Sequence, residues 1–405
     1  MLSEDAIENL VYPILERQEN INIYVLRKIA QRIREIGHLL PSDIHKLERL
    51  LKTGSDTREI NKFLSEQTGI QEQNIKQLIK TVALDAYIDA KPFFDYRHKS
   101  FIPFAQNKPL QRVVSSISKQ TAGEYVNLSN SKATGFLIRD MKHPGRLKFH
   151  SINDTYRTVV DEAIQAVSSG VIDYNTAMRR TMQQLVDSGV RKMYWDSGYT
   201  QRLDTAVRRN ILDGVRAINQ GVQDEVGREF GADGKEITVH SNSAPDHEPV
   251  QGHQFTNEEF DKLQNNEPFK DVNGIKFQPI RRAIGTLNCR HFTYSIIIGY
   301  TKPNYTLKEL DYLKKKNAKG YTMPDGNHLT MYECTQKQRE LETKIRRAKD
   351  GQIAALDEGD MNLAKKYQAK INKYTNQYKE FSKACGLSPK MKKASVSGYK
   401  RIKLT

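Results

Sequence analysis

Histidine and cysteine are concentrated in one short part of this chain, between His240 and His291. The 405 residues include 10 His and 3 Cys, yet four of these His and Cys289 lie in this segment. The segment is bracketed by residues 236–240, which alternate as in a strand, and by residues 292–298, which are rich in aromatic and β-branched side chains. Because imidazole and thiolate often bind metals, we expect a small sheet here that carries a polar site.

The candidate ligands are His240, His247, Cys289 and His291. If Cys289 and His291 lie on a strand, the period of two places both side chains on one face. Four nitrogen and sulfur donors match a structural zinc site, although such sites usually have two close ligand pairs and this segment has one. Two interpretations remain open: a structural zinc site, or a buried hydrogen-bonded cluster that holds the loop against the strand.

Catalytic interpretations of the same residues are weaker. Asp246-His247 together with Asn288 and His291 superficially resembles a His-Asn-His metal nuclease, which needs a general base beside a phosphate-binding cation. The required strand-turn-helix order is not evident. A nucleophilic Cys289 acting with His291 would lack a third, orienting group. We therefore expect a protein that is not an enzyme.

The net charge is strongly positive, with 64 Lys and Arg against 48 Asp and Glu, a formal charge of +16. This excess favours a polyanionic partner. It is most uniform after Phe381, where no acidic residue follows, so we expect a tail that is mobile until it binds. The candidate phosphate contacts in this tail are Lys390, Lys392, Lys393, Lys400, Arg401 and Lys403.

No export or membrane signal is evident in the sequence, so we expect a protein made in a cytoplasm. The three cysteines are odd in number and far apart, which predicts no disulfide framework. The first residues carry acids where a signal peptide would carry bases, and no apolar run reaches the roughly 20 residues of a membrane span.

The periodicity predicts an α+β protein with a mainly helical N-terminal part, a central α+β domain with a small sheet, and a C-terminal helical hairpin. In the N-terminal part we expect short helices, one of them over residues 42–51, with stops at Gly37 and Gly69. The expected segments are a helical bundle (1–90), an irregular connector or arm (91–150), an α+β domain (151–330), an antiparallel, coiled-coil-like hairpin (331–385) and a basic tail (386–405).

The helices expected in the second half follow from apolar spacing and breakers. We place them at residues 153–169, 174–185, 205–226, 335–356 and 361–384.

An ordered series of short motifs gives the chain a family resemblance. His240, Pro245-Asp246-His247, Gln251-Gly252 and Asn288-Cys289-Arg290-His291 occur in this order, and Tyr332-Glu333-Cys334-Thr335 follows. Over residues 150–395 the chain resembles the phage minor capsid protein 2 family, related to the Mu F-type minor head proteins. Asp246, Val250 and residues 293–299 depart from the family pattern. The resemblance therefore implies the family fold rather than a shared aromatic pocket. The hydrogen-bonded interpretation adds further members of a structural polar cluster: Gln251, Gly252, Asn288 and Arg290.

The resemblance implies a structural minor capsid protein of a tailed phage or prophage. Such a protein would be assembled in the host cytoplasm and located in the virion, in the capsid interior or at the portal vertex. Its expected partners are the portal protein, other head proteins and genomic DNA, and its roles would be head assembly and DNA packaging or ejection. The alternatives are the metal-dependent nuclease and a DNA-binding accessory protein of packaging.

Overall fold

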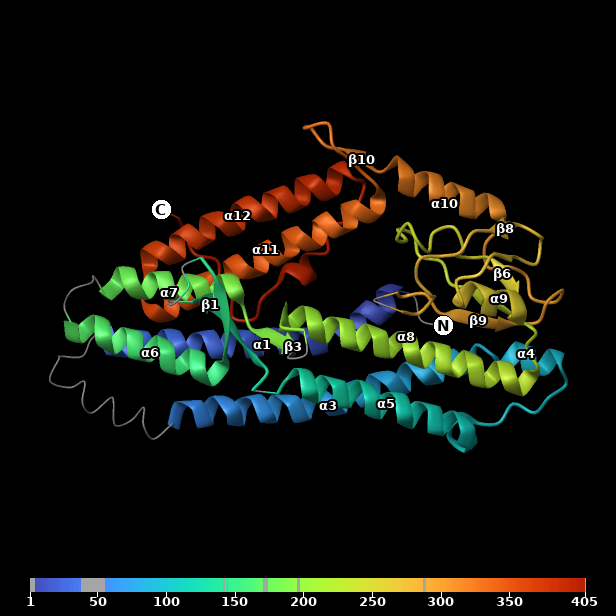
Figure 1. The fold of residues 1–405 in the computed structure, drawn as a ribbon, viewed down its shortest axis with the longest axis horizontal. Helices are drawn as coiled ribbons and strands as arrows, with labels where there is room; N and C mark the ends of the chain where they lie inside the picture. The colour runs from blue at the N-terminus through green and yellow to red at the C-terminus, as the bar shows by residue number, and fades with distance from the viewer. Residues whose placement is uncertain are drawn as a thin grey trace. The chain divides into compact units, whose positions relative to one another are not determined.

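The structure is a computed structural model that describes residues 4–37, 55–130, 132–140, 143, 145–169, 174–194, 197–286 and 289–404. These residues are mainly helical and include small antiparallel sheets (Figure 1), which confirms the expected α+β class. The chain divides into two compact units. Unit 1 comprises Met1–Val11, Gln73–Gly123 and Arg209–Lys337, and unit 2 comprises Tyr12–Glu72, Glu124–Arg208 and Gln338–Thr405. The five-part division expected from the sequence stays a prediction.

The N-terminal helices are longer than expected. Helix α1 runs over Glu4–Gly37 with Pro13 inside it, and helix α3 runs over Ser55–Ile88 without stopping at Gly69. The expected stop at Gly69 was wrong because one glycine costs a helix only about 1 kcal/mol, and buried apolar side chains such as Leu64 and Ile75 flank it. The expected helix at residues 42–51 lies outside the described residues.

The expected irregular connector contains regular structure, which corrects the prediction. The helices are α4 (Lys91–Tyr96), the 3-10 turn η2 (Phe104–Gln106) and α5 (Lys108–Leu128). Pro92 and Pro109 did not prevent these helices because each lies in a first turn, where the missing N–H has no helical partner to lose.

Unit 2 contains a four-stranded antiparallel sheet in the order β2-β1-β3-β4. The strands are β1 (Thr134–Arg139), β2 (Leu147–Ser151), β3 (Arg191–Tyr194) and β4 (Tyr199–Arg202). Helices α6 (Ile152–Ser169) and α7 (Tyr174–Ser188) pack against β1, and both confirm expected helices (Figure 1).

The C-terminal helical hairpin is confirmed. Helices α11 (Met331–Glu358) and α12 (Met361–Ala384) run in opposite directions (Figure 1). Leu341, Ile345 and Tyr378 form a buried cluster between them, and Tyr378 donates a hydrogen bond of 2.8 Å to buried Glu342. The finer expectation of coiled-coil packing stays a prediction.

The sheet that positions the candidate site belongs to unit 1. Helix α8 (Leu203–Phe230), expected over 205–226, leads into strand β5 (Gly234–Ile237). Strand β5 is central in the order β6-β5-β9, between β6 (Gln254–Thr256) and β9 (Thr293–Ile296). The other elements of this part are α9 (Asn257–Gln264), β7 (Phe269–Lys270), β8 (Lys276–Phe277), α10 (Leu307–Lys319), β10 (Tyr321–Thr322) and β11 (His328–Leu329).

An apolar core supports this sheet. Helix α9 begins at an N-cap in which the Thr256 side chain accepts a hydrogen bond from the Glu259 N–H. The helix buries Phe260 and Leu263. The buried members of the core are Ile237, Val250, Phe255, Phe260, Leu263, Phe269, Ile280 and Ile284.

Candidate metal centre

Two loops meet at one end of the three-stranded sheet. Ile237 at the end of β5 pairs with Thr293 at the start of β9, and Glu236 pairs with Gln254 at the start of β6. The segment that follows β5 and the segment that precedes β9 therefore leave the sheet at the same end of the strands. The Thr238 N–H donates to the Phe292 carbonyl at 3.0 Å and continues the contact beyond the strands.

A glycine fixes the return of the first loop. Gly252 has φ = +74°, and its N–H donates to the Ile237 carbonyl at 2.8 Å. A Cβ on Gly252 would lie 2.5 Å from Leu310 and 2.9 Å from Val239. Glycine suits this position because residues with a side chain rarely adopt the left-handed conformation, and a Cβ would force Leu310 and Val239 to shift. The loop that ends here carries Val250 into the apolar core.

Three of the four predicted ligands come together. The Cys289 Sγ lies 3.2 Å from His247 Nδ1 and 3.4 Å from His291 Nδ1. All three residues are buried, with exposures of 1% for His247, 6% for Cys289 and 4% for His291. Their donor atoms lie within 4.8 Å of one another. We call these three residues the His/Cys cluster.

The fourth predicted ligand, His240, is adjacent to the His/Cys cluster. Its ring packs edge-to-face on His291, with 4.5 Å between ring centroids, and its donor atoms are not part of the group that could hold a metal among the described residues. The expected strand geometry was also wrong, because β9 begins at Thr293 and the preceding Cys289 and His291 lie in a loop.

Outer hydrogen bonds orient both cluster imidazoles. His247 Nε2 lies 2.9 Å from the carbonyl oxygen of Arg282, and His291 Nε2 lies 3.4 Å from the side-chain oxygen of Gln251. The Gln251 oxygen also accepts a hydrogen bond from the His240 N–H at 2.9 Å. Carbonyl oxygens only accept, so both Nε2 atoms donate and the Nδ1 atoms of the neutral rings face Cys289 with lone pairs.

The pKa values of the two cluster histidines are shifted in opposite directions. Burial lowers the pKa of His247, but the hydrogen bonds with Cys289 and Arg282 outweigh it and the pKa is raised. Burial raises the pKa of the Cys289 thiol, and the contacts with His247 more than reverse this, so its pKa is lowered. Burial and the neighbouring His240 and His247 lower the pKa of His291 to about 2. His291 is therefore neutral at physiological pH.

The other predicted members of this region have different positions. Gln251 and Gly252 support the cluster as described above, and Arg290 is half-buried. Asn288 lies outside the described residues. Sequence reasoning missed the Arg282 carbonyl, because any residue type supplies a backbone acceptor and no pattern marks it. It also missed the ion pair between Asp246 and Arg282, with 2.5 Å between Oδ2 and Nε.

The basic tail is docked on its own unit, which corrects the expectation of a mobile segment. Its 3-10 turn η3 (Met391–Ala394) buries Ala394 against α11 and α12. Val396 packs with Ile23 and Ile353, so apolar side chains interleaved with the lysines attach the tail. The exposed predicted phosphate contacts are Lys390, Lys392, Lys400, Arg401 and Lys403, whereas Lys393 is half-buried.

Unit 2 also buries a group of charged side chains contributed by α1, β4, α8 and α11, which we call the carboxylate–arginine cluster. Arg202 Nε lies 3.2 Å from Asp204, and Arg346 Nη2 lies 3.3 Å from the same carboxylate. The buried carboxyl groups of Glu19 and Asp350 also belong to this cluster, and each influences the pKa of the other. No sequence pattern marks this cluster because its members are separated by up to hundreds of residues.

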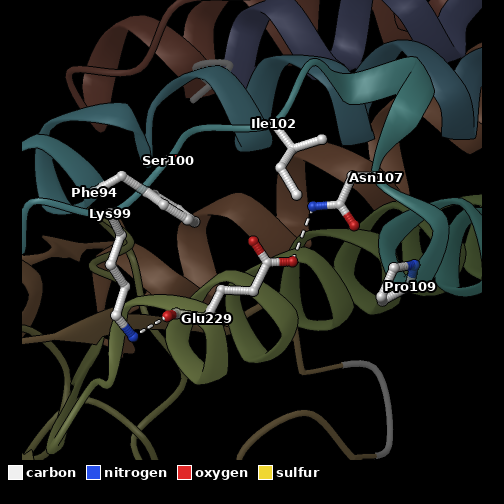
Figure 2. A pocket seen from close by; sticks show the side chains of 7 residues that line it. All are labelled: Phe94, Lys99, Ser100, Ile102, Asn107, Pro109 and Glu229. Atoms are coloured by element: carbon white, nitrogen blue, oxygen red, sulfur yellow. Dashed lines mark hydrogen bonds between the residues drawn. The ribbon is translucent and has the colours of Figure 1, made fainter.

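Unit 1 also contains an open hollow of about 450 Å³ between α4, the start of α5 and the end of α8 (Figure 2). Glu229 accepts a hydrogen bond from Asn107 at 2.8 Å, and its carbonyl accepts one from Lys99 at 2.5 Å. Phe94, Ile102 and Pro109 complete the hollow with apolar surface. None of its lining residues belongs to the His/Cys cluster.

Comparisons with known proteins agree with the resemblance read from the motifs. In the part of the chain that the structure describes, no helix is long and apolar enough to cross a membrane. The search of curated proteins and the search of solved structures gave no match. A family model described as Phage minor capsid protein 2 matches residues 2–383, nearly the whole chain. The chain therefore belongs to the phage minor capsid protein 2 family, whose members are structural proteins of the phage particle.

Proposed function

We propose that this protein is a portal-associated component of the interior of a tailed-phage head, where it aids head assembly and contacts the packaged DNA. Family membership supports the structural role. The observation that carries the DNA contact is the docked basic tail, together with the net charge of +16. The portal association and the interior location rest on the family resemblance.

The docked tail presents its cations from a fixed backbone. Lys390 N–H donates to the Tyr378 hydroxyl at 2.8 Å, and Arg346 and Lys349 each donate to tail carbonyls at 2.7 Å. Farther along, the Ile402 N–H donates to the Gln368 side chain at 3.0 Å. Holding the backbone in place lowers the entropy lost when the charged side chains meet phosphates. This favours contact with a polyanion that has no defined sequence.

A DNA-binding measurement with the full chain tests this part of the proposal. The variant replaces the five exposed tail cations with glutamine and keeps the apolar anchors: Lys390→Gln, Lys392→Gln, Lys400→Gln, Arg401→Gln and Lys403→Gln. Affinity for a duplex of mixed sequence is measured by fluorescence anisotropy over a salt series. Each phosphate contact contributes about 0.9 to the salt slope, so we expect the slope to fall by about 3 to 4 units.

The matched control removes five exposed lysines from the segment that includes α10 in unit 1: Lys302, Lys308, Lys314, Lys316 and Lys319. The net charge change is the same. We expect a much smaller loss of slope in this control. Equal losses in both variants would show attraction by net charge alone, and an unchanged slope in the tail variant would contradict the tail's role.

A co-purification experiment tests the head location. The chain is co-expressed with the portal protein encoded in the same phage genome, and complexes are separated by size-exclusion chromatography. We expect both proteins in one peak. Separate elution, combined with retained DNA binding, would favour a packaging accessory protein without a place on the portal.

The nuclease alternative finds little support in the site. A metal nuclease needs its cation within reach of a scissile phosphate, whereas the three side chains of the His/Cys cluster are at most 6% exposed. A plasmid-nicking assay with added Mg²⁺ or Zn²⁺ tests this directly. Cleavage by the wild type that is lost in His247→Ala would support the nuclease interpretation.

A further inference from the structure

The His/Cys cluster brings three potential ligand atoms within 4.8 Å of one another. The outer acceptors hold the Nε2 proton of His247 and of His291, so both Nδ1 atoms face Cys289 without a proton. The arrangement is fully buried. It also combines two imidazoles and one thiol from segments about 40 residues apart in sequence.

With both imidazoles neutral and Cys289 a thiol, hydrogen bonds within the cluster do not satisfy every lone pair. The Cys289 thiol has one proton, which can serve the Nδ1 of His247 or that of His291. Moving that proton onto His247 supplies no donor for His291. One buried acceptor is therefore left without a partner among the three groups, and such an acceptor costs about 1–3 kcal/mol.

We propose that the cluster is a zinc site in which His247 Nδ1, Cys289 Sγ and His291 Nδ1 bind the metal. A cation satisfies all three lone pairs at once, and a mixed imidazole and thiolate set is characteristic of zinc. Tetrahedral bonds of about 2.0 Å to nitrogen and 2.3 Å to sulfur place the ligand atoms about 3.5 Å apart. The sulfur–nitrogen distances of 3.2 and 3.4 Å are close to that spacing.

The outer contacts match what a zinc-binding histidine needs. Zinc-bound imidazoles usually donate their other N–H to a carbonyl or carboxylate, which fixes the ring and its tautomer. Here the Arg282 carbonyl serves His247, and the Gln251 oxygen serves His291. Asp246 binds Arg282 in turn and lies 3.9 Å from His247 Nε2.

The zinc site would join the two loops at one end of the β6-β5-β9 sheet. His247 lies in the loop that follows β5, and the other two ligands lie just before β9. Metal binding then contributes directly to the folding of unit 1, because the ligands are assembled only in the folded state. This inference is independent of the proposed head location and of DNA contact.

The test measures zinc in the full chain after expression in zinc-supplemented medium. Inductively coupled plasma mass spectrometry is expected to find about one zinc per chain in the wild type and none in Cys289→Ser or His291→Ala. Two matched controls are expected to keep the zinc. Cys334→Ser removes another buried thiol of unit 1, and His240→Ala removes the histidine beside the cluster.

A cobalt experiment on the wild type guards against variants that fail to fold. Replacing zinc with Co²⁺ is expected to give the sulfur-to-cobalt charge-transfer band of a thiolate ligand, together with visible d–d bands. A wild-type protein without zinc and without these bands would overturn the proposal. Zinc retained in Cys289→Ser, or lost in His240→Ala, would overturn the assigned ligand set, and copper in place of zinc would overturn the metal's identity.

A positioning variant sharpens the test. Gln251→Ala removes the acceptor of His291 Nε2 and leaves the three ligands in place. Loss of such an outer partner is expected to weaken zinc binding about 10- to 100-fold, measured by competition with a chelating dye. An unchanged zinc affinity would contradict this positioning role.

Discussion

The protein has two buried polar clusters, and each compensates for the loss of water around its polar side chains with different chemistry. The His/Cys cluster of unit 1 uses neutral or weakly acidic groups from residues 247–291. The carboxylate–arginine cluster of unit 2 uses formal charges from residues as distant in sequence as Glu19 and Asp350. The first groups three potential metal ligands within 4.8 Å of one another, whereas the second sets carboxylates beside guanidinium groups.

In unit 2, the buried charged side chains shift one another's pKa values. Burial lowers the pKa of Arg202, but Asp204, Glu19 and Asp350 outweigh it and keep the guanidinium charged. Burial raises the pKa of Asp204, and Arg202 and Arg346 more than reverse this, so Asp204 stays ionised. Burial raises the pKa values of Glu19 and Asp350, and the nearby carboxylates raise them further.

The largest expected effect comes from removing the central cation of unit 2. Arg202→Met removes the guanidinium group, keeps an unbranched side chain and leaves buried Asp204 with one cation fewer, so we expect unit 2 to lose about 3–5 kcal/mol of stability. Hydrogen-exchange mass spectrometry under increasing urea reports the two units separately. Lys62→Ala breaks an exposed ion pair in α3 and is expected to change stability by less than about 0.5 kcal/mol. A similar small loss for Arg202→Met would show that the buried charges are not coupled.

A smaller effect of opposite sign is expected for Glu19→Gln. The folded state holds a proton on Glu19 above its ordinary pKa of 4.5. Its favourable contribution is therefore complete below pH 4.5 and is lost as the pH rises through the raised pKa. Glutamine donates to Asp350 without this cost, so we expect the variant to be more stable than wild type by about 1 kcal/mol at pH 8 and to have no advantage at pH 4.

The measurement for Glu19→Gln is urea unfolding at both pH values, followed through exchange in α1 and α11. Glu66→Gln, at an exposed position of α3, is the control, for which we expect almost the same stability as wild type at each pH. A Glu19→Gln variant less stable than wild type at pH 8 would show that the ionised carboxylate is the favoured partner of Arg202.

The smallest effect concerns the rim of the His/Cys cluster. Asp246→Asn weakens the ion pair with Arg282. The Asp246 side chain is 17% exposed and the Arg282 side chain is 30% exposed. Exposed pairs contribute up to about 1 kcal/mol, so we expect a loss below that value in unit 1. Exchange rates of the Val250 and Gly252 amides measure it, because both donate hydrogen bonds within the loop region. A loss above about 2 kcal/mol would mean that the ion pair, and not the cluster, holds the loop.

Local patterns were sufficient for the helices that keep one periodicity. The expected helices at 153–169, 205–226 and 361–384 correspond to α6, α8 and α12 within a few residues. They were insufficient where breakers had to be weighed against packing. Gly69 was read as a stop, but the helix continues because buried side chains flank it.

The candidate site was predictable in composition but not in assembly. His247, Cys289 and His291 stood out because histidine and cysteine are scarce elsewhere in the chain. Their meeting depends on the pairing of β5 with both β6 and β9. His240 has the same residue type and a similar position in sequence, yet its ring packs beside His291 outside the donor group.

Residue types and their local spacing were enough to predict the α+β class, the family, the basic charge and the segment that carries the His/Cys cluster. Only the tertiary structure decided which donors converge, that the basic tail is docked through Ala394 and Val396, and that unit 2 buries Arg202 among carboxylates. The physical reason is that burial and contact depend on which distant segments pack together. A charged side chain is identical in sequence whether it meets water or another charge.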